Sequence, residues 1–419
     1  MARDSIFPTF FLSGFECSTF DWKDRGRRDV AEELQHYAHA DEDYGFLASL
    51  GIATAREGIP WPFVDKGEGE YDFSRIDPLL HAQPRHGVLP IWSLSHYGYP
   101  DGLDPLCDPS GFAARFAAYA RAAARYVAER AHHGPLCFCP VNEPTFWGYM
   151  GGEWAWCAPF GKSADDRRRF TLALARADIA ACKAIRQDFP DARFVHIDPL
   201  IWVVPPRDRP DLADEAHREA HDDAYIAWDV ISGLKHPEYG GSLELIDVLG
   251  FNNYSFGQME YSGGGKPNNP LKPGDPRIRS VCDLIEEAWS KYRRPCIIAE
   301  TSGLYGGRPE WLDDMTCEAL AAVNRGVDLH GICLFPAVDM QDWHSGEWLH
   351  MGIADVEPLP NGALMRKPFL PYVERLHHWQ RRFNRVTKLD EDPYDSPVNL
   401  DDILRAAKEL DPAADADWS

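Results

Sequence analysis

The chain has 419 residues, with 43 Lys+Arg against 66 Asp+Glu and a formal net charge of −23. Nucleic acids and anionic membranes both attract basic surfaces, so this charge argues against a protein that binds either of them. Because 44% of the residues are hydrophobic and 26% are charged, the chain can bury a large core, which excludes bulk disorder.

The N-terminal segment lacks the continuous apolar stretch of a signal peptide, and no stretch of roughly 18 apolar residues could span a membrane. We therefore expect a cytoplasmic protein whose 10 cysteines are reduced. Several cysteines lie inside apolar runs, where Cys behaves as a small hydrophobic residue. Structural zinc needs four clustered ligands, so no metal site is expected.

Eight short apolar runs follow one another along the chain, each of a length suited to one strand. They cover residues 9–18, 51–56, 88–94, 136–142, 193–199, 248–254, 296–300 and 331–339. The runs are apolar on both faces, which indicates a parallel sheet that is covered on both sides.

Amphipathic segments of helical period separate these runs. The spacing predicts helices over residues 111–132, 170–189, 281–292 and 311–325. Eight strands alternating with helices predict a single (β/α)₈ barrel. An open doubly wound sheet is the alternative, but no G-x-G-x-x-G motif follows any of the runs.

The Gly- and Pro-rich stretches at residues 203–214 and 262–275 are predicted to be long loops after the fifth and sixth strands. With no internal repeat, we expect one barrel domain over residues 1–385. An acidic tail of residues 386–419 is expected to form a surface helix and a frayed end.

Polar residues lie where the predicted strands end, which is where a barrel of this kind carries its active site. They are Arg56, His96, Asn142, Glu143, Asn252, Tyr254, Glu300, Asp342 and Trp343.

Two of these residues, Glu143 and Glu300, are carboxylates that end hydrophobic runs. Burying an unpaired carboxylate costs several kcal/mol, so each must be hydrogen-bonded or functional. A single one would be explained most simply by an ion pair. Two at one barrel mouth, with Arg56 available to keep one ionised, favour acid/base-assisted cleavage of a glycosidic bond.

The motif Asn142-Glu143-Pro144 after an apolar strand, together with Glu300, resembles the barrel glycosidases that retain anomeric configuration, and in detail the family-one glycoside hydrolases. Residues 43–56 and 331–343 are similar to that family's second-strand and eighth-strand motifs. The resemblance extends over residues 14–355.

The resemblance implies a general acid/base, Glu143, and a nucleophile, Glu300, acting through a covalent glycosyl-enzyme with the two carboxyls roughly 5 Å apart. It implies no cofactor. Desolvation beside Asn142 and Trp147 would raise the pKa of Glu143. Arg56 and the Tyr254 hydroxyl would keep Glu300 ionised.

The resemblance also implies sugar contacts. Asn142 would bond the 2-hydroxyl, and His96 would contact a ring hydroxyl unless it is a core or helix-capping residue. Phe335 and Trp343 would offer flat rings to the sugar. The remaining tryptophans near the mouth could rest against the leaving group, although any single one is more often packing: Trp147, Trp154, Trp156 and Trp202.

Two departures from the family concern the sugar. The first strand lacks the usual Gln, so Glu16 could take over a hydroxyl contact, or it could pair with Arg27 or Arg28. Asp342 stands where a Glu is usual and would repel a 6-phospho-sugar.

We therefore expect an exo-acting retaining β-glycosidase for a small β-glycoside with a non-standard sugar. The alternatives are an endo-acting glycanase, a transglycosylase or a catalytically silent carbohydrate-binding barrel. The sequence leaves the oligomeric state open.

Overall fold

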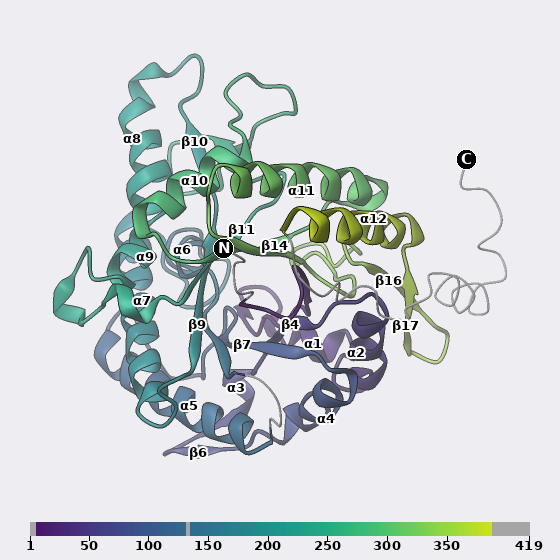
Figure 1. Cartoon of the computed structure of the whole chain (residues 1–419). Coiled ribbons are helices and arrows are strands. Elements are labelled where there is room, and N and C mark those ends of the chain that lie inside the picture. The colour runs from purple at the N-terminus through teal and green to yellow at the C-terminus, as the bar shows by residue number, and fades with distance from the viewer. Residues whose placement is uncertain (1–5, 131–134, 388–419) are drawn as a thin grey trace.

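The computed structural model describes residues 6–130 and 135–387. A closed barrel of eight parallel strands forms its centre (Figure 1). The strands are β1 (Phe11–Gly14), β4 (Thr54–Gly58), β7 (Leu89–Ser95), β8 (Cys137–Val141), β9 (Arg193–Pro199), β11 (Val248–Asn252), β14 (Cys296–Thr301) and β15 (Leu329–Leu334). Neighbours in the barrel follow chain order, and β15 returns to pair with β1. The predicted barrel is confirmed, and each predicted run overlaps one barrel strand.

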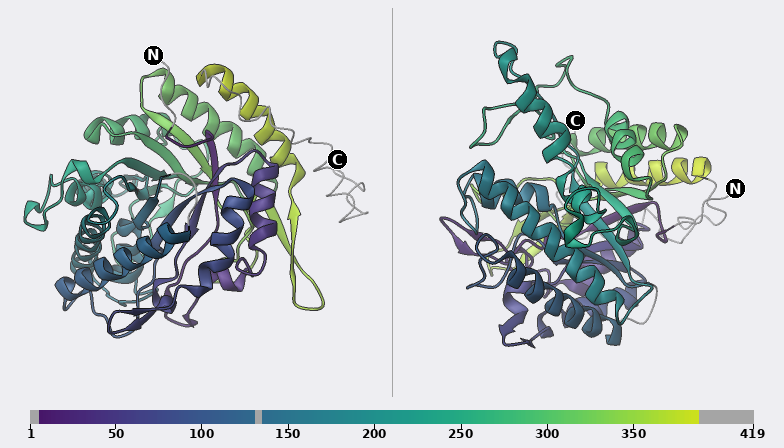
Figure 2. Two further views of the ribbon diagram at one scale, coloured as in Figure 1. Left: turned by 60° about the horizontal axis from the view of Figure 1, so that its bottom comes forward. Right: turned by 90° about the vertical axis from the view of Figure 1, so that its left-hand side faces the viewer.

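Helices surround this barrel on its outer side (Figure 2). The longer ones are α2 (Ala40–Ser49), α4 (Asp77–His86), α5 (Pro109–Arg130), α7 (Ala164–Arg186), α10 (Val281–Tyr292), α11 (Arg308–Asn324) and α12 (Leu370–Thr387). The shorter ones are α1 (Val30–Glu33), α3 (Trp61–Val64), α6 (Pro144–Trp147), α8 (Ala213–Arg218) and α9 (Ile226–Ile231). Side-chain caps fix two of the starts, because the Ser163 and Ser280 hydroxyls accept backbone N–H groups in the first turns of α7 and α10.

The segments between the barrel strands and after β15 contain further short strands. They are β2 (Asp21–Trp22), β3 (Gly26–Arg27), β5 (Asp65–Gly67), β6 (Glu70–Tyr71), β10 (Trp202–Val204), β12 (Gln258–Glu260), β13 (Asn269–Pro270), β16 (Ala354–Pro358) and β17 (Leu364–Pro368). β10, β12 and β13 form one small sheet, which projects beyond the barrel together with α8 (Figure 1). The stretches 203–214 and 262–275, predicted to be plain loops, therefore contain strand residues, and the first also contains a short 3-10 helix (Pro210–Leu212) and the first two residues of α8.

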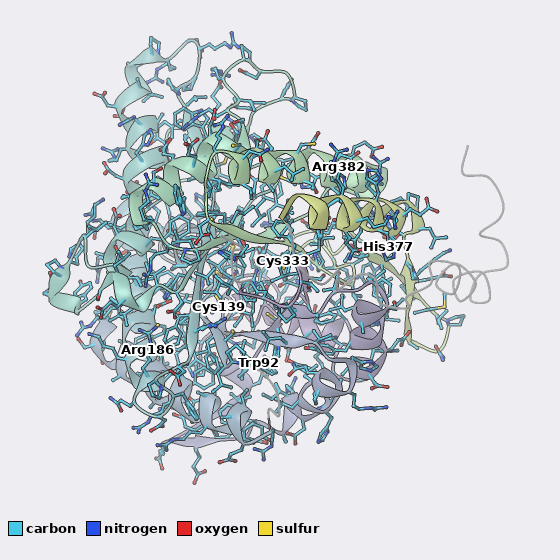
Figure 3. The ribbon with its side chains drawn as sticks, viewed as in Figure 1. Trp92, Cys139, Arg186, Cys333, His377 and Arg382 are labelled. Carbon is cyan, nitrogen blue, oxygen red and sulfur yellow. The ribbon has the colours of Figure 1, made fainter. Side chains whose placement is uncertain are left out.

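Apolar side chains fill the barrel interior. This inner core includes Ile91, Cys139, Val195, Ile297 and Cys333, and Figure 3 labels Cys139 and Cys333 near the middle of the molecule. Because side chains occupy the barrel axis, a ligand can enter only at a mouth of the barrel.

Strand β17, near the C-terminal end of the described chain, is bound to helix α2 near the N-terminal end. Arg366 in β17 donates from Nε and Nη2 to the two carboxylate oxygens of Asp43 in α2, at 2.8 and 3.0 Å. The predicted acidic tail lies outside the described residues, except for the end of α12. None of the helices in the described ranges combines the length and apolar character needed to cross a membrane.

Candidate active site

A cavity of about 530 Å³ lies at the carboxyl ends of the barrel strands. Its lining includes most of the predicted site residues, contributed by segments that end or follow six different strands. They are Glu16, His96, Glu143, Asn252, Tyr254, Glu300, Phe335, Asp342 and Trp343. The topology thus brings together residues that are far apart in the sequence.

Glu143 is held by two neutral donors. It follows β8 with a left-handed φ of 44°, and Asn252 Nδ2 donates to its Oε1 at 2.7 Å. The Tyr97 hydroxyl donates to Oε2. Burial, and then the nearby charge of Glu300, raise the pKa of Glu143 to about 8. Glu143 is therefore mainly a neutral acid at pH 7.

Glu300 in β14 has a different environment. Arg56 Nη1 donates to its Oε1, and the Tyr254 hydroxyl donates to its Oε2 at 2.9 Å. An ion pair and a hydroxyl donor both stabilise the carboxylate form. The two carboxyls of one cavity are thus placed to carry different charges.

Arg56 and Asn142 lie behind the cavity wall and do not line it. Arg56 Nη2 donates to Asn142 Oδ1 at 2.6 Å, and Asn142 Nδ2 contacts His96 Nε2 at 3.0 Å. Both ends of the Asn142 amide are therefore engaged by protein groups.

His96 is a neutral imidazole in this network, because burial and the charge of Arg56 hold its pKa well below the usual range. Its Nε2 accepts from Asn142, which leaves the proton on Nδ1, 3.1 Å from the sulfur of Cys17. The ring still borders the cavity.

The predicted tryptophans fall into two groups. Trp154, Trp156 and Trp343 line the cavity. The expectation that Trp147 faces the ligand is wrong, because α6 turns it into the protein, where it is fully buried against Phe170. Trp202 is also outside the lining: its indole N–H donates to Arg277 O at 3.2 Å.

Two acidic residues of the cavity lining are held by local donors. Asp342 Oδ1 accepts the backbone N–H groups of His344 and Ser345 and the Ser345 hydroxyl, at 2.7 to 3.0 Å. Glu16 Oε1 accepts the backbone N–H of Ser18 at 3.0 Å and the Ser18 hydroxyl.

The alternative pairing of Glu16 with an arginine is wrong. Arg27 binds Asp101 and Thr19 O, and Arg28 binds Glu33.

Tyr97, whose hydroxyl donates to Glu143, was not predicted from the sequence. It follows His96 at the end of β7 with a left-handed φ of 63°. This backbone conformation, which sequence position alone does not reveal, directs the ring toward Glu143. Apolar side chains make up much of the remaining wall, among them Phe146, Leu200, Phe256, Met340 and Met351.

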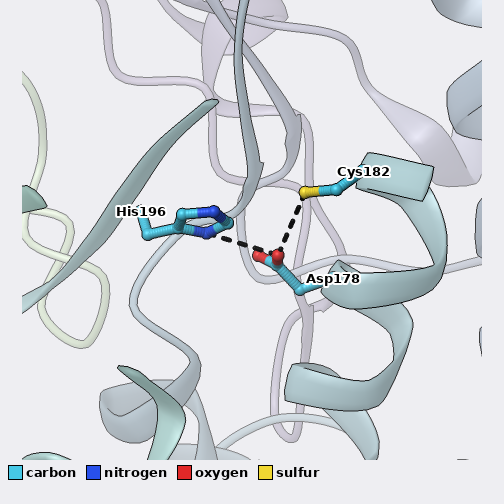
Figure 4. Close-up of side chains that lie close together, drawn as sticks. All are labelled: Asp178, Cys182 and His196. Carbon is cyan, nitrogen blue, oxygen red and sulfur yellow. Dashed lines mark hydrogen bonds and ion pairs between the residues drawn. The ribbon is translucent and has the colours of Figure 1, made fainter. Parts of the chain in front are cut away.

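Two clusters in the described ranges bring residue types that can bind metals close together, and protein groups contact members of both. Asp178 and Cys182 in α7 meet His196 in β9 (Figure 4), with His196 Nδ1 3.3 Å from Asp178 Oδ1. Burial raises the pKa of Cys182 well above its usual value, so it is a thiol and not the thiolate that metals bind. In the second cluster, Asp355 pairs with Arg308.

No family model matches the sequence. Solved structures with the same fold include a family 1 β-glucosidase from Thermotoga maritima, with a TM-score of 0.69, 17% identity, and coverage of 90% of this chain and 99% of that one. The T. maritima β-glucosidase in complex with deoxynojirimycin gives a TM-score of 0.70 at 17% identity, with coverage of 88% of this chain and 98% of that one. Its complex with a methoxycarbonyl-substituted glucoimidazole gives a TM-score of 0.71 at 17% identity, with coverage of 90% of this chain and 99% of that one. The chain therefore has the barrel fold of the family 1 β-glucosidases.

Proposed function

We propose that this protein is a retaining β-glycosidase that removes a sugar from the end of a small β-glycoside. The observation that carries the proposal is the pair of carboxyls in one cavity. Glu143 is neutral and Glu300 is bound to Arg56. The shared fold supports the same conclusion, since the structural neighbours are β-glucosidases, one of them in complex with deoxynojirimycin.

The geometry suits a double displacement. Glu300 attacks the anomeric carbon and forms a glycosyl ester, while Glu143 gives its proton to the leaving oxygen. Glu143 is then a carboxylate and takes a proton from the water that cleaves the ester, which restores both groups. Tyr254, which donates to Glu300, fixes the direction of the attacking carboxylate.

Kinetics with aryl β-glycosides test the roles of the two carboxyls. Glu143→Gln should lower kcat/KM for poor leaving groups by about 10²–10⁴-fold. The loss should be much smaller for 2,4-dinitrophenyl glycosides, because a good leaving group needs no proton.

Glu300→Gly should lose turnover, and added azide should restore part of it by yielding an α-glycosyl azide. Unchanged activity in Glu300→Gln would contradict the proposed nucleophile. Sugar binding without cleavage of any activated glycoside would indicate a carbohydrate-binding barrel instead.

A further inference from the structure

The cavity is strongly acidic. Carboxyl side chains in its lining come from Glu16, Glu143, Glu219, Glu300 and Asp342, and within the described parts of the chain no Lys or Arg lines it. A low-dielectric pocket with one sign of charge favours ligands of the opposite sign.

Most of these carboxyls are compensated. Glu143 holds a proton, and Glu300 is paired with Arg56. Glu219 accepts from Asn268 Nδ2 at 2.6 Å and Asp342 accepts three local donors. Glu143 and Glu300 therefore leave little unmatched charge, Asp342 is partly exposed to solvent, and the nearby charge of Arg167 stabilises the carboxylate form of Glu219.

Glu16 differs from them. Its side chain is almost completely buried, with 2% of the residue exposed, and the only donors that contact it among the described residues belong to Ser18. No Lys or Arg of residues 6–130 or 135–387 forms an ion pair with it, because Arg56 is engaged by Glu300 and Asn142. Burying an unpaired carboxylate is costly, so a cation that enters the cavity gains by pairing with it.

We propose that Glu16 selects a β-glycoside whose sugar carries a protonated amino group. This inference rests on the proposed glycosidase function and names its substrate class. The ammonium supplies the cation that the cavity lacks and donates a charge-assisted hydrogen bond to Glu16. A neutral hydroxyl can also donate to the Glu16 carboxylate but brings no compensating charge, and a uronate or phosphorylated sugar is repelled.

The charge of Glu16 depends on pH near neutrality, because burial raises its pKa to about 7. Glu143 in the same cavity also titrates near neutrality, with a pKa of about 8, whereas four neighbouring groups keep their charge state. The Cys17, Tyr97 and Tyr254 pKa values are raised well above their usual range, and that of His96 is lowered. Arg56 and Glu300 form an ion pair.

Preference for an amino sugar over a neutral one should therefore increase as pH rises through about 7, until the ammonium itself loses its proton. The need for a protonated Glu143 cancels in this ratio, because both substrates use the same acid. The negative charge that Glu143 gains above its pKa of about 8 does not cancel, so the same pH series in Glu16→Gln gives the part of the change that belongs to Glu143.

The test compares kcat/KM for 4-nitrophenyl β-glucoside with its 2-, 3-, 4- and 6-amino-deoxy analogues. For at least one amino isomer, the amino-to-parent ratio should fall about tenfold or more in Glu16→Gln relative to wild type. Comparing the two proteins cancels the intrinsic reactivity of each substrate. Gln keeps the oxygen that accepts from Ser18, and Glu219→Gln serves as a matched carboxyl control whose ratio should stay unchanged.

An unchanged ratio in Glu16→Gln, or an equal fall in Glu219→Gln, would overturn the assignment to Glu16 while leaving the glycosidase proposal intact. The wild-type pH series is informative even if a variant misfolds, and a ratio independent of pH between 6 and roughly 7.5 would also overturn it. Failure of wild type to cleave any of the glycosides would refute the proposed function, and the inference with it.

Discussion

Glu143 and Glu300 show how the surroundings of a side chain decide its chemistry. Both are buried glutamates in the same cavity. Glu143 has only neutral donors, Tyr97 and Asn252, whereas Glu300 has a guanidinium. An acid and a carboxylate thus coexist at one pH, as a double displacement requires.

Keeping Glu143 neutral has a cost in stability that Glu143→Gln should remove. Its folded-state pKa is about 8, above the ordinary value of 4.5, so the folded protein binds this proton more tightly than the unfolded chain does. Stability of the wild type should therefore fall as pH rises from about 4.5 to 8.

The Gln variant has no such titration, and its free energy of unfolding relative to wild type should increase over this window. The upper limit is about 1.4 kcal/mol per unit of pKa shift. Denaturant unfolding at several pH values checks this, and a constant difference between the two proteins would contradict it.

Among individual residues, the sequence predicted the location of those whose place depends only on where a strand ends. Glu143 and Glu300 end apolar runs, and that position alone puts them at the barrel mouth. Tyr97 and Trp147 depend on side-chain direction within a loop or a short helix, which local sequence does not specify. Tyr97 was therefore not predicted as a site residue, and Trp147 was expected in the cavity although it lies in the core.

The eight barrel strands could be predicted because each is buried on both faces and forms a continuous apolar run. The sheet of β10, β12 and β13 could not, since strands of two or three residues are too short to show a period. The start of α7 was predicted six residues late, at 170 in place of Ala164, because its first turn carries the polar pair Asp165 and Asp166.

Close packing between strands makes Gly250 in β11 a sensitive position. A Cβ there would lie 2.6 Å from Ile197 Cγ1 and 2.9 Å from Ala299 Cβ. Gly250→Ala should therefore destabilise the protein by about 1–3 kcal/mol in urea unfolding. Gly306→Ala is the control, since a Cβ at Gly306 would meet nothing within 4 Å. Equal stability of the two variants would show that the barrel accommodates the methyl group.

For the whole molecule, burial sorts the ten cysteines into two classes. All are free, and only Cys107 and Cys317 are exposed. Burial also raises the pKa values of Cys139 and Cys333 to about 12, so they are protonated as well as inaccessible.

A thiol reagent should therefore label two cysteines rapidly in the native protein and all ten after denaturation. The double variant Cys107→Ser/Cys317→Ser should show no rapid labelling. Fast modification of a third thiol would indicate that the native core opens readily.

Closure of the barrel between β1 and β15 also has a consequence for biosynthesis. The Ser13 hydroxyl donates to Leu334 O across a separation of 321 residues, so β1 leaves the ribosome long before its partner has been made. Until β15 emerges, one side of β1 is an unpaired strand edge on a growing chain, which is the kind of surface that associates with other chains. During translation, that edge therefore stays open to association with other chains until β15 has been made.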